Sequence, residues 1–277
     1  MTASASASVR RAFWPYAVAV LAVVVSLFPI FWILTIALKT QVDAFAMPPV
    51  WFFSPVWENF GKAWSSTGFS GAFFNSLIVC AIGNVLALAA GIPAAYYLNR
   101  KHVPGRRTIL IWLLVSYMLP EFLFIVPMYV LFQSIGLYDT VIGLALIYQV
   151  FTLPFTIWLL RAFFADIPEA LAEAARLEGA STFRIVWTIY VPIAAPGIAA
   201  TVILNSIKMW NELTIALALT FEKAQTVTLA VAGFRGYASI DWGAMSAASI
   251  IIILPMALFA ILAQRRIVQG LSLGAVK

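Results

Sequence analysis

Two long apolar stretches of the chain are separated by the sequence DIPEALAEAARLEG, residues 166–179. Asp166 and Glu169 have the spacing of a capping box, and Pro168 fits a first helical turn, where its missing N–H is not needed. Gly179 can adopt the left-handed conformation that closes a helix at its far end. These signals predict a short polar helix with both ends marked.

A second short helix is expected to follow this one. Ser181 can cap it, and it should end before Pro192. Four residues at helical spacing give the first helix a face of mostly small side chains: Ala170, Leu171, Ala174 and Ala175. We therefore expect a compact knob, residues 164–192, made of two helices joined at Gly179.

The sequence around the knob belongs in a lipid bilayer. Of its 277 residues 63% are hydrophobic and 10% charged, and the mean hydropathy is +0.98. Stretches of about 20 apolar residues can cross a membrane as helices, which satisfy their own backbone hydrogen bonds. Six such stretches are present: Pro15–Leu38, Ala72–Leu98, Thr108–Phe132, Thr140–Phe163, Ile193–Leu219 and Gly243–Ala263. The predicted fold is an all-α polytopic integral membrane protein with six transmembrane helices.

Basic residues set the orientation of these helices, because arginine and lysine gather in cytoplasmic loops. They are enriched before the first stretch, in the second and fourth connections and after the last stretch, so both termini and the knob are expected in the cytoplasm. The domain prediction is a disordered tail 1–14, a single transmembrane domain 15–263 with an external arm 39–71, and a cytoplasmic tail 264–277.

Several classes of function are disfavoured by composition. The formal charge of +6 is mostly accounted for by the orientation signal, so it does not indicate nucleic-acid binding. Cys80 is the only cysteine and His102 the only histidine, which predicts no internal disulfide and no metal site. No phosphate-binding GxxxxGK[ST] loop and no Ser-His-Asp set is present, so we expect no catalytic residues.

Ionisable residues inside the apolar stretches point to a cavity or a partner, because each costs about 2.5–3.5 kcal/mol at the bilayer centre on insertion scales. Lys208 and Glu212 are four residues apart and are expected to pair, beside Trp210 and Asn211, which suit a polyhydroxylated solute. The alternative is that the pair holds a second subunit. Glu121 either lines a passage or accepts a hydrogen bond between helices.

The knob resembles the hallmark of the ATP-binding-cassette importer permeases, Glu-Ala-Ala, a glycine four residues on, then Ile-x-Leu-Pro. It stands here as Glu173–Ala175, Gly179 and Ile189–Pro192, with Val191 in place of leucine. The resemblance covers nearly the whole chain and narrows to carbohydrate-importer permeases of the maltose inner-subunit type. The segments that carry it are Leu38–Thr40 with Asp43, Asn75–Leu77, Gly136–Thr140, Trp210–Glu212 and Gln264–Lys277.

The resemblance implies a sugar, polyol or glycoside importer in the plasma membrane of a bacterium or archaeon. Its partners would be a different permease subunit, two cytoplasmic ATPases that bind ATP and Mg, and an external solute-binding protein, while this chain holds no cofactor. It implies an ATPase-coupling role for Glu169, Glu173, Ala174, Ala175, Gly179, Ser181, Phe183, Arg184 and Pro192, and a tail contact through Gln269, Gly270 and Lys277. The alternative is a secondary transporter or channel with Glu121, Lys208 and Glu212 as an ion relay, which leaves the knob unexplained.

Overall fold

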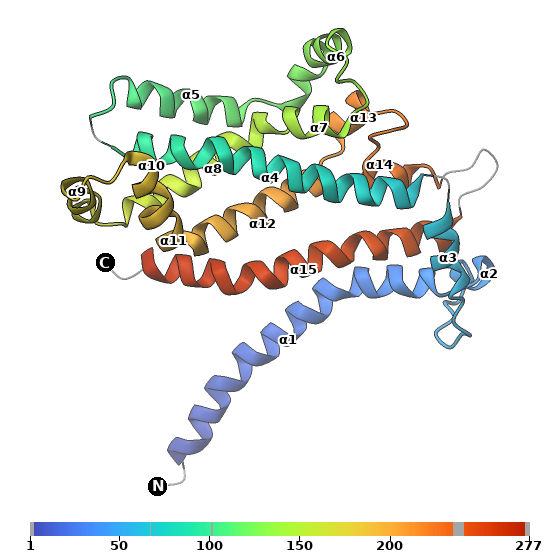
Figure 1. The fold of residues 1–277 in the computed structure, drawn as a ribbon. Coiled ribbons are helices and arrows are strands. Elements are labelled where there is room, and N and C mark those ends of the chain that lie inside the picture. Colours follow the sequence, from blue (N-terminus) through green and yellow to red (C-terminus); the bar gives the residue numbers. More distant parts are fainter. Residues whose placement is uncertain (1–2, 67, 101, 235–240, 275–277) are drawn as a thin grey trace. The chain divides into compact units, whose positions relative to one another are not determined.

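The computed structural model describes residues 3–66, 68–100, 102–234 and 241–274, with side chains for 14–66, 68–100, 102–234 and 241–262. Helices dominate this part of the chain and no strand occurs in it, which confirms the predicted all-α class. The chain divides into two compact units, Met1–Ser66 with Gly233–Ile253, and Thr67–Ala232 with Leu254–Lys277. Their elements are drawn in Figure 1.

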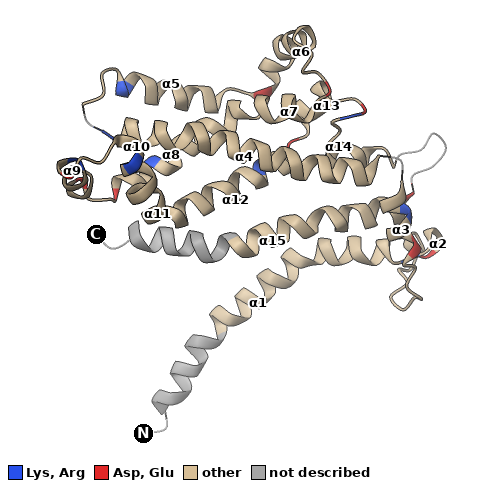
Figure 2. Ribbon diagram, viewed as in Figure 1, with Lys and Arg blue, Asp and Glu red and all other residues tan. Residues whose placement is uncertain are grey.

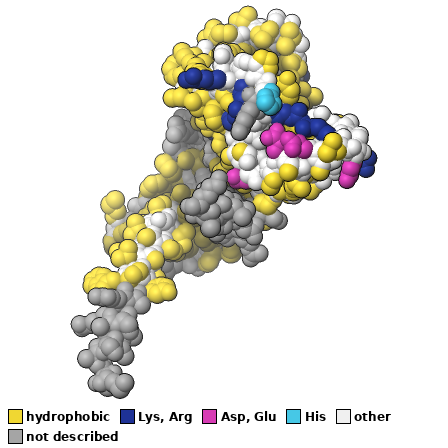
Figure 3. Space-filling view, turned by 90° about the vertical axis from the view of Figure 1, so that its left-hand side faces the viewer, with side chains coloured by type: hydrophobic (Ala, Val, Ile, Leu, Met, Phe, Trp, Pro, Cys, Tyr) yellow, Lys and Arg dark blue, Asp and Glu magenta, His cyan; other side chains and the backbone are white. Residues whose placement is uncertain are grey.

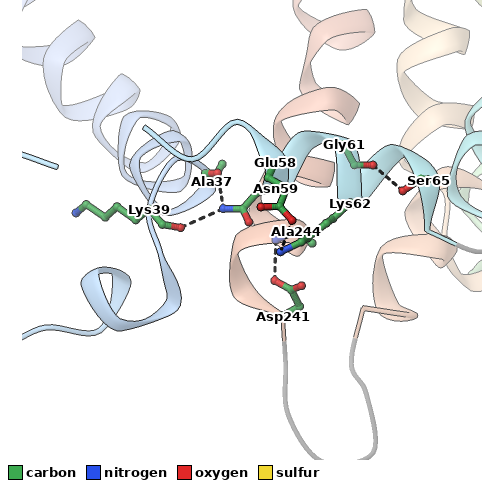
Figure 4. A network of polar contacts seen from close by, with 9 residues as sticks. All are labelled: Ala37, Lys39, Glu58, Asn59, Gly61, Lys62, Ser65, Asp241 and Ala244. Atoms are coloured by element: carbon green, nitrogen blue, oxygen red, sulfur yellow. Dashed lines mark hydrogen bonds and ion pairs between the residues drawn. The ribbon is translucent and has the colours of Figure 1, made fainter. Parts of the chain in front are cut away.

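The first unit is organised around the end of its long first helix. It contains α1 (Ala3–Ala37), α2 (Gln41–Ala44), α3 (Glu58–Ser65) and the first part of α15 (Trp242–Gly274). The buried amide of Asn59 donates hydrogen bonds to the carbonyls of Ala37 (2.9 Å) and Lys39 (3.0 Å), as Figure 4 shows. These carbonyls lie at the carboxyl end of α1, where no further helical N–H is available, so Asn59 fixes how the chain leaves that helix.

The start of α15 is fixed by the same group of contacts. Asp241 accepts the backbone N–H of Ala244 at 3.0 Å, which satisfies a free donor of the first turn. A Cβ atom at Gly243 would lie 2.7 Å from the side-chain amide of Asn59, so a larger residue would have to displace that amide from its hydrogen bonds.

The described start of α1 differs from the predicted disordered tail 1–14. α1 begins at Ala3, and Met1 and Thr2 lie outside the described residues. Alanine has the highest helix propensity, and extending an existing helix avoids the unfavourable nucleation step. The alternating alanine and serine residues can therefore continue the helix in the amino-terminal direction.

In the second unit, α4 (Phe69–Asn99) is the central helix. It lies against α7 (Val141–Ile147), α8 (Gln149–Ala165), α12 (Ala195–Asn211) and α14 (Val227–Ala232). A Cβ at Gly91 would overlap the Thr156 side chain of α8, so glycine lets these two backbones approach closely.

Polar side chains also join these helices. Asn84 of α4 donates to the hydroxyl of Ser206, and Asn205 donates to the hydroxyl of Thr156, both at 2.9 Å. α12 is therefore hydrogen-bonded to α4 on one side and to α8 on the other. Such bonds are common between membrane helices, where the alternative partner would be hydrocarbon.

Three described helical segments are long and apolar enough to cross a membrane by themselves: Trp14–Ala37, Phe69–Asn99 and Trp242–Leu262. Three further pairs meet the same test only when taken together, and each is bent at a short break: Arg106–Met118 with Glu121–Ser134 by 95°, Val141–Ile147 with Gln149–Ala165 by 49°, and Thr182–Ile193 with Ala195–Asn211 by 79°. The described part of the chain thus has up to six spans by length and composition.

The predicted continuous helices 108–132, 140–163 and 193–219 are therefore wrong in detail. The first is interrupted between α5 (Arg106–Met118) and η1 (Glu121–Phe124), which is followed by α6 (Ile125–Ser134). Leu119 is extended there (φ −67°, ψ 135°), as expected of a residue that precedes proline. The last is interrupted at Glu212, before α13 (Thr214–Leu219).

Candidate functional site

The connection between α8 and α12 contains the predicted helix, glycine and helix of the knob. The first helix is α9 (Glu169–Leu177). The second is continuous through α10 (Thr182–Ile185), the π-helical turn η2 (Val186–Tyr190) and α11 (Val191–Ile193). It meets α12 at Ala194 with a bend of 79°.

Gly179 closes α9 in the predicted conformation, with φ at +83°. Its N–H donates to the carbonyl of Arg176 at 3.0 Å, and the N–H of Ala180 donates to Ala175 at 2.9 Å. This pair of bonds is a Schellman motif, which satisfies the carbonyls at the end of a helix and requires a left-handed residue. The elbow is therefore determined locally.

The predicted capping box at the start of α9 is wrong. Asp166 ends α8, while α9 begins at Glu169, with Pro168 before it and no side-chain hydrogen bond to the first turn. Proline disfavours the helical conformation in the preceding residue, Ile167, so α9 cannot begin soon enough for Asp166 to cap it.

The second helix begins as predicted and ends later than predicted. The Ser181 hydroxyl accepts the N–H of Arg184 at 3.3 Å. The helix does not end before Pro192 but continues to Ile193. An ordinary α-helical turn would need an N–H at position 192, which proline lacks. The wider π-helical turn before Pro192 has a different hydrogen-bond pattern, so the helix can continue past the proline.

One face of the knob is anchored in the core of the second unit. Ala172 of α9 and Ile185 and Tyr190 of the second helix are buried in one apolar cluster with residues of α4 and α8, including Tyr96 and Phe164. The rings of Tyr96 and Tyr190 meet edge to face with centroids 4.8 Å apart. The knob is thus packed into the same core as α4 and α8.

The opposite face of the knob is exposed. Most of the predicted coupling residues are exposed: Glu169, Glu173, Ala174, Gly179, Ser181, Phe183, Arg184 and Pro192. Ala175 is half-buried beside the core. Two apolar side chains stand out, Leu177 at 91% exposed and Phe183 at 74%. Figure 3 looks at the end of the molecule that carries α9, where apolar and charged side chains share the surface.

Lys208 has a different ionic partner from the one predicted. Its Nζ lies 2.5 Å from Oε1 of Glu121 and 5.1 Å from the centre of the Phe151 ring. The predicted pair with Glu212 is wrong because α12 ends at Asn211, and Glu212 is extended (φ −71°, ψ 124°). The two residues therefore do not occupy successive turns of one helix.

Glu212 instead joins two broken helices. Its buried carboxylate accepts the Tyr148 hydroxyl at 3.0 Å and the backbone N–H groups of Ile215 (2.8 Å) and Ala216 (3.1 Å). Tyr148 lies at the break between α7 and α8, and the two N–H groups begin α13. Glu212 thus supplies acceptors for backbone groups that the break in the helix leaves free.

The two predicted solute-binding neighbours differ in accessibility. Trp210 is 1% exposed and its ring packs edge-on against Phe73, so it offers no free stacking face. Asn211 is exposed and donates to the carbonyl of Ile207 at 2.8 Å. The predicted tail contacts Gln269, Gly270 and Lys277 lie outside the part of the chain whose side chains the structure describes.

Two important residues were not among the predicted site residues. Tyr96 accepts hydrogen bonds from Arg100 and Arg176, and nothing in the sequence distinguishes it from other tyrosines of apolar stretches. Asp139 accepts the backbone N–H groups of residues 221–224 at 2.9–3.2 Å. Asp139 lies in Gly136–Thr140, one of the segments that carry the family resemblance, and this position could have indicated its importance.

Apolar helices of spanning length, broken helix pairs and a polar knob define a polytopic membrane protein with the architecture of a transporter. The chain belongs to the family of binding-protein-dependent transport system inner membrane components, whose family description matches residues 83–273. It is thus a permease component of an ABC importer and not the ATPase of that importer.

Named relatives are similar over almost their whole length. The trehalose transport system permease protein SugB of Mycobacterium tuberculosis is 36% identical over 97% of this chain and 98% of its own. The trehalose/maltose transport system permease protein MalG of Thermococcus litoralis is 31% identical over 94% of this chain and 94% of its own. One chain in the crystal structure of a bacterial ABC transporter involved in the import of the acidic polysaccharide alginate shares the fold, with a TM-score of 0.76, 20% identity and coverage of 92% and 96%.

Proposed function

We propose that the chain is the permease subunit of an ATP-driven importer for a carbohydrate or a related polyol or glycoside. The named relatives that support this substrate class carry trehalose and maltose, and their similarity extends over nearly the whole chain. ATP hydrolysis in partner subunits would drive alternating access of the solute pathway. No cofactor on this chain is part of the proposal.

The proposed topology has six spans with both termini in the cytoplasm. The three long helices and three bent pairs supply the spans, and the distribution of basic residues supplies the orientation. Figure 2 is consistent with this, since charged residues of the second unit lie mostly near the ends of its helices. The protein would reside in the plasma membrane of a bacterium or archaeon.

The observation that carries the proposal is the construction of the knob. One face is buried against α4 and α8, and the other presents exposed Leu177 and Phe183 beside the Gly179 elbow. A rigid element with one anchored face and one free face can transmit the motion of a partner to the helices. We propose that this partner is a cytoplasmic ATPase that binds ATP and Mg.

The other proposed partners are a second ATPase copy, a different permease subunit and an external solute-binding protein. The family description itself supports the binding protein. The membrane would then contain a pathway shared by two permease subunits. The tail residues Gln269, Gly270 and Lys277 are proposed to contact the ATPase as well.

The ion pair between Glu121 and Lys208 is proposed to line the translocation pathway or an interface with the second permease. A cavity of about 210 Å³ beside Lys208 supports the pathway, because its lining includes Tyr117, Phe151 and Phe155. Aromatic side chains suit the apolar faces of a sugar ring, and the Lys208 ammonium, which also lines the cavity, can donate to sugar hydroxyls. Trp210 and Glu212 would then act from within the core, behind the pathway.

The test is replacement of the elbow glycine. Gly179→Asp is expected to leave membrane insertion intact and to abolish ATP hydrolysis coupled to sugar uptake. A Cβ at Gly179 meets no atom of the described residues within 4 Å, so a clash with a partner is the expected steric effect beyond the local backbone strain. The left-handed backbone imposes its own strain of about 1–2 kcal/mol.

Gly105→Asp is the matched control. Gly105 also has a positive φ, +71°, and open space around it, but it lies in the turn between α4 and α5. The control carries the same charge and a similar strain outside the knob. Uptake and ATP hydrolysis would be measured in proteoliposomes with the co-purified subunits, and normal coupling in Gly179→Asp would refute the coupling role.

A further inference from the structure

A cavity of about 440 Å³ lies where the knob meets the ends of α4 and α8 and the start of α5. Its charged lining consists of Arg100, Arg106, Arg161, Arg176, Asp166 and Glu169. We refer to it as the basic pocket. Its arginines come from both the knob and the body of the second unit, and Figure 3 views the end of the molecule on which such basic side chains gather.

The positive charge of the basic pocket is not neutralised within the described residues. Its lining holds four arginines against two carboxylates, and no ion pair joins them in the described part of the chain. Moreover, the Nε atom of Arg161 is buried and has no hydrogen-bond partner among the described residues. A buried donor without an acceptor is rare and points to a group that supplies one.

The arginines of the basic pocket are held in place while most of their donors remain unused. Arg100 and Arg176 both donate to the Tyr96 hydroxyl, at 2.5 and 3.1 Å. Arg106 donates through Nε to the carbonyl of Leu98 at 2.8 Å. Arg161 lies over the Trp158 ring at 5.3 Å. Each guanidinium has five N–H donors, so several remain available to an oxyanion.

We propose that the basic pocket binds a phosphate group, with the chemistry shared by the headgroup of an anionic phospholipid and a free phosphate. The planar guanidinium fork matches phosphate oxygens in pairs, and several forks can converge on one group. The basic pocket also lies at the ends of α4 and α8, and basic pockets between the cytoplasmic ends of membrane helices are known to bind lipid headgroups. The site is separate from the cavity beside Lys208, and it adjoins the proposed ATPase contact, since Glu169 lines the basic pocket.

A bound phosphate would connect the knob to the body of the second unit. Arg176 lies on α9, whereas Arg100, Arg106 and Arg161 lie on or beside α4, α5 and α8. An anion held by both groups would restrain the knob, and its loss would leave like charges facing one another. The lipid composition of the membrane would therefore influence how firmly the knob is held.

The test is binding of anionic lipid by the full chain, purified in mild detergent with the subunits it retains. Native mass spectrometry would compare retention of phosphatidylglycerol and phosphatidylcholine by the wild type and by Arg100→Gln/Arg161→Gln. We expect phosphatidylglycerol retention to fall roughly fivefold for each arginine removed. Retention of phosphatidylcholine should not change.

Arg184→Gln is the matched control, since this exposed arginine of the knob does not line the basic pocket. If the double variant does not fold, Arg176→Gln replaces it, because this side chain is exposed on α9 and its loss leaves the buried part of the knob intact. For this single variant the expected loss is roughly fivefold.

Inorganic phosphate distinguishes the two sources of the group. Competition between millimolar phosphate and phosphatidylglycerol would support a site that accepts either, and its absence would support a site that requires the lipid. Equal retention of phosphatidylglycerol by the wild type, the pocket variants and Arg184→Gln would overturn the proposal. Binding only after removal of the ATPase would also overturn it, since an acidic side chain of that partner would then fill the basic pocket.

Discussion

The carboxylate of Glu212 provides a demanding test of how the broken helices are stabilised. Oε1 accepts the N–H of Ile215, and Oε2 accepts the N–H of Ala216 and the hydroxyl of Tyr148, all within 3.1 Å. All three partners are donors. Replacement by glutamine leaves one oxygen and places an NH2 group against a backbone N–H.

The expected losses follow from counting the orphaned donors. In Glu212→Gln the Tyr148 hydroxyl can rotate to accept from the new NH2 group, so one backbone N–H loses its acceptor, at about 1–3 kcal/mol. In Glu212→Ala both N–H groups and the buried Tyr148 hydroxyl lose theirs, at about 3–9 kcal/mol in total. Alanine should therefore be clearly worse than glutamine.

The assay is reversible denaturation of the purified chain in a fixed detergent, followed by tryptophan fluorescence. Asn211→Ala is the neighbouring control. Among the described residues this exposed side chain bonds to the carbonyl of Ile207 and the sulfur of Met256 alone, so its loss should change the free energy of unfolding by less than about 0.5 kcal/mol. A wild-type free energy of unfolding in Glu212→Gln would refute the reasoning, as would equal losses in Glu212→Gln and Glu212→Ala.

Two further predictions concern other polar contacts. Partial burial raises the pKa of Asp139, but four backbone N–H donors lower it more, so its pKa lies below the ordinary value of 3.8. The stability that the ionised carboxylate contributes should therefore be complete above about pH 3.8 and lost as the pH falls below it. Asp139→Asn should therefore lower the free energy of unfolding by about 1 kcal/mol at pH 7 and by progressively less below pH 4, which pH-dependent denaturation would measure, and a difference that grew in acid would contradict this. Lys208→Met and Glu121→Gln should each reduce sugar uptake and membrane yield more than the double variant does, because an unpaired charge within the membrane costs about 2.5–3.5 kcal/mol. Wild-type affinity and rate in Glu121→Gln would remove this residue from the pathway.

Features that depend on neighbouring residues were predictable from the sequence. The left-handed conformation of Gly179 and the cap at Ser181 depend on a few neighbouring residues. Tertiary packing does not change them, and both were predicted correctly. The capping box failed even though it is also local. Pro168 excluded an earlier helix start, and α8 continued to Ala165, so two local rules competed and the proline prevailed.

Features that depend on distant residues were not predictable. Lys208 pairs with Glu121, which is far away in the sequence, because the helix break at Glu212 removes the nearer carboxylate from its face. Tyr96 gained its role only when the knob folded back and brought Arg176 to its hydroxyl. No periodicity in the sequence encodes such encounters.

The sequence by itself determined that this chain is helical and membrane-embedded, that a capped polar knob interrupts it, and which family it resembles. These properties rest on apolar length, local capping and a short motif, all of which act over a few helical turns. Only the tertiary structure decided where the long helices break, which charges pair and that four arginines surround one pocket. The reason is physical: a buried polar group takes whichever partner packing brings within hydrogen-bond reach, and packing is a property of the whole fold.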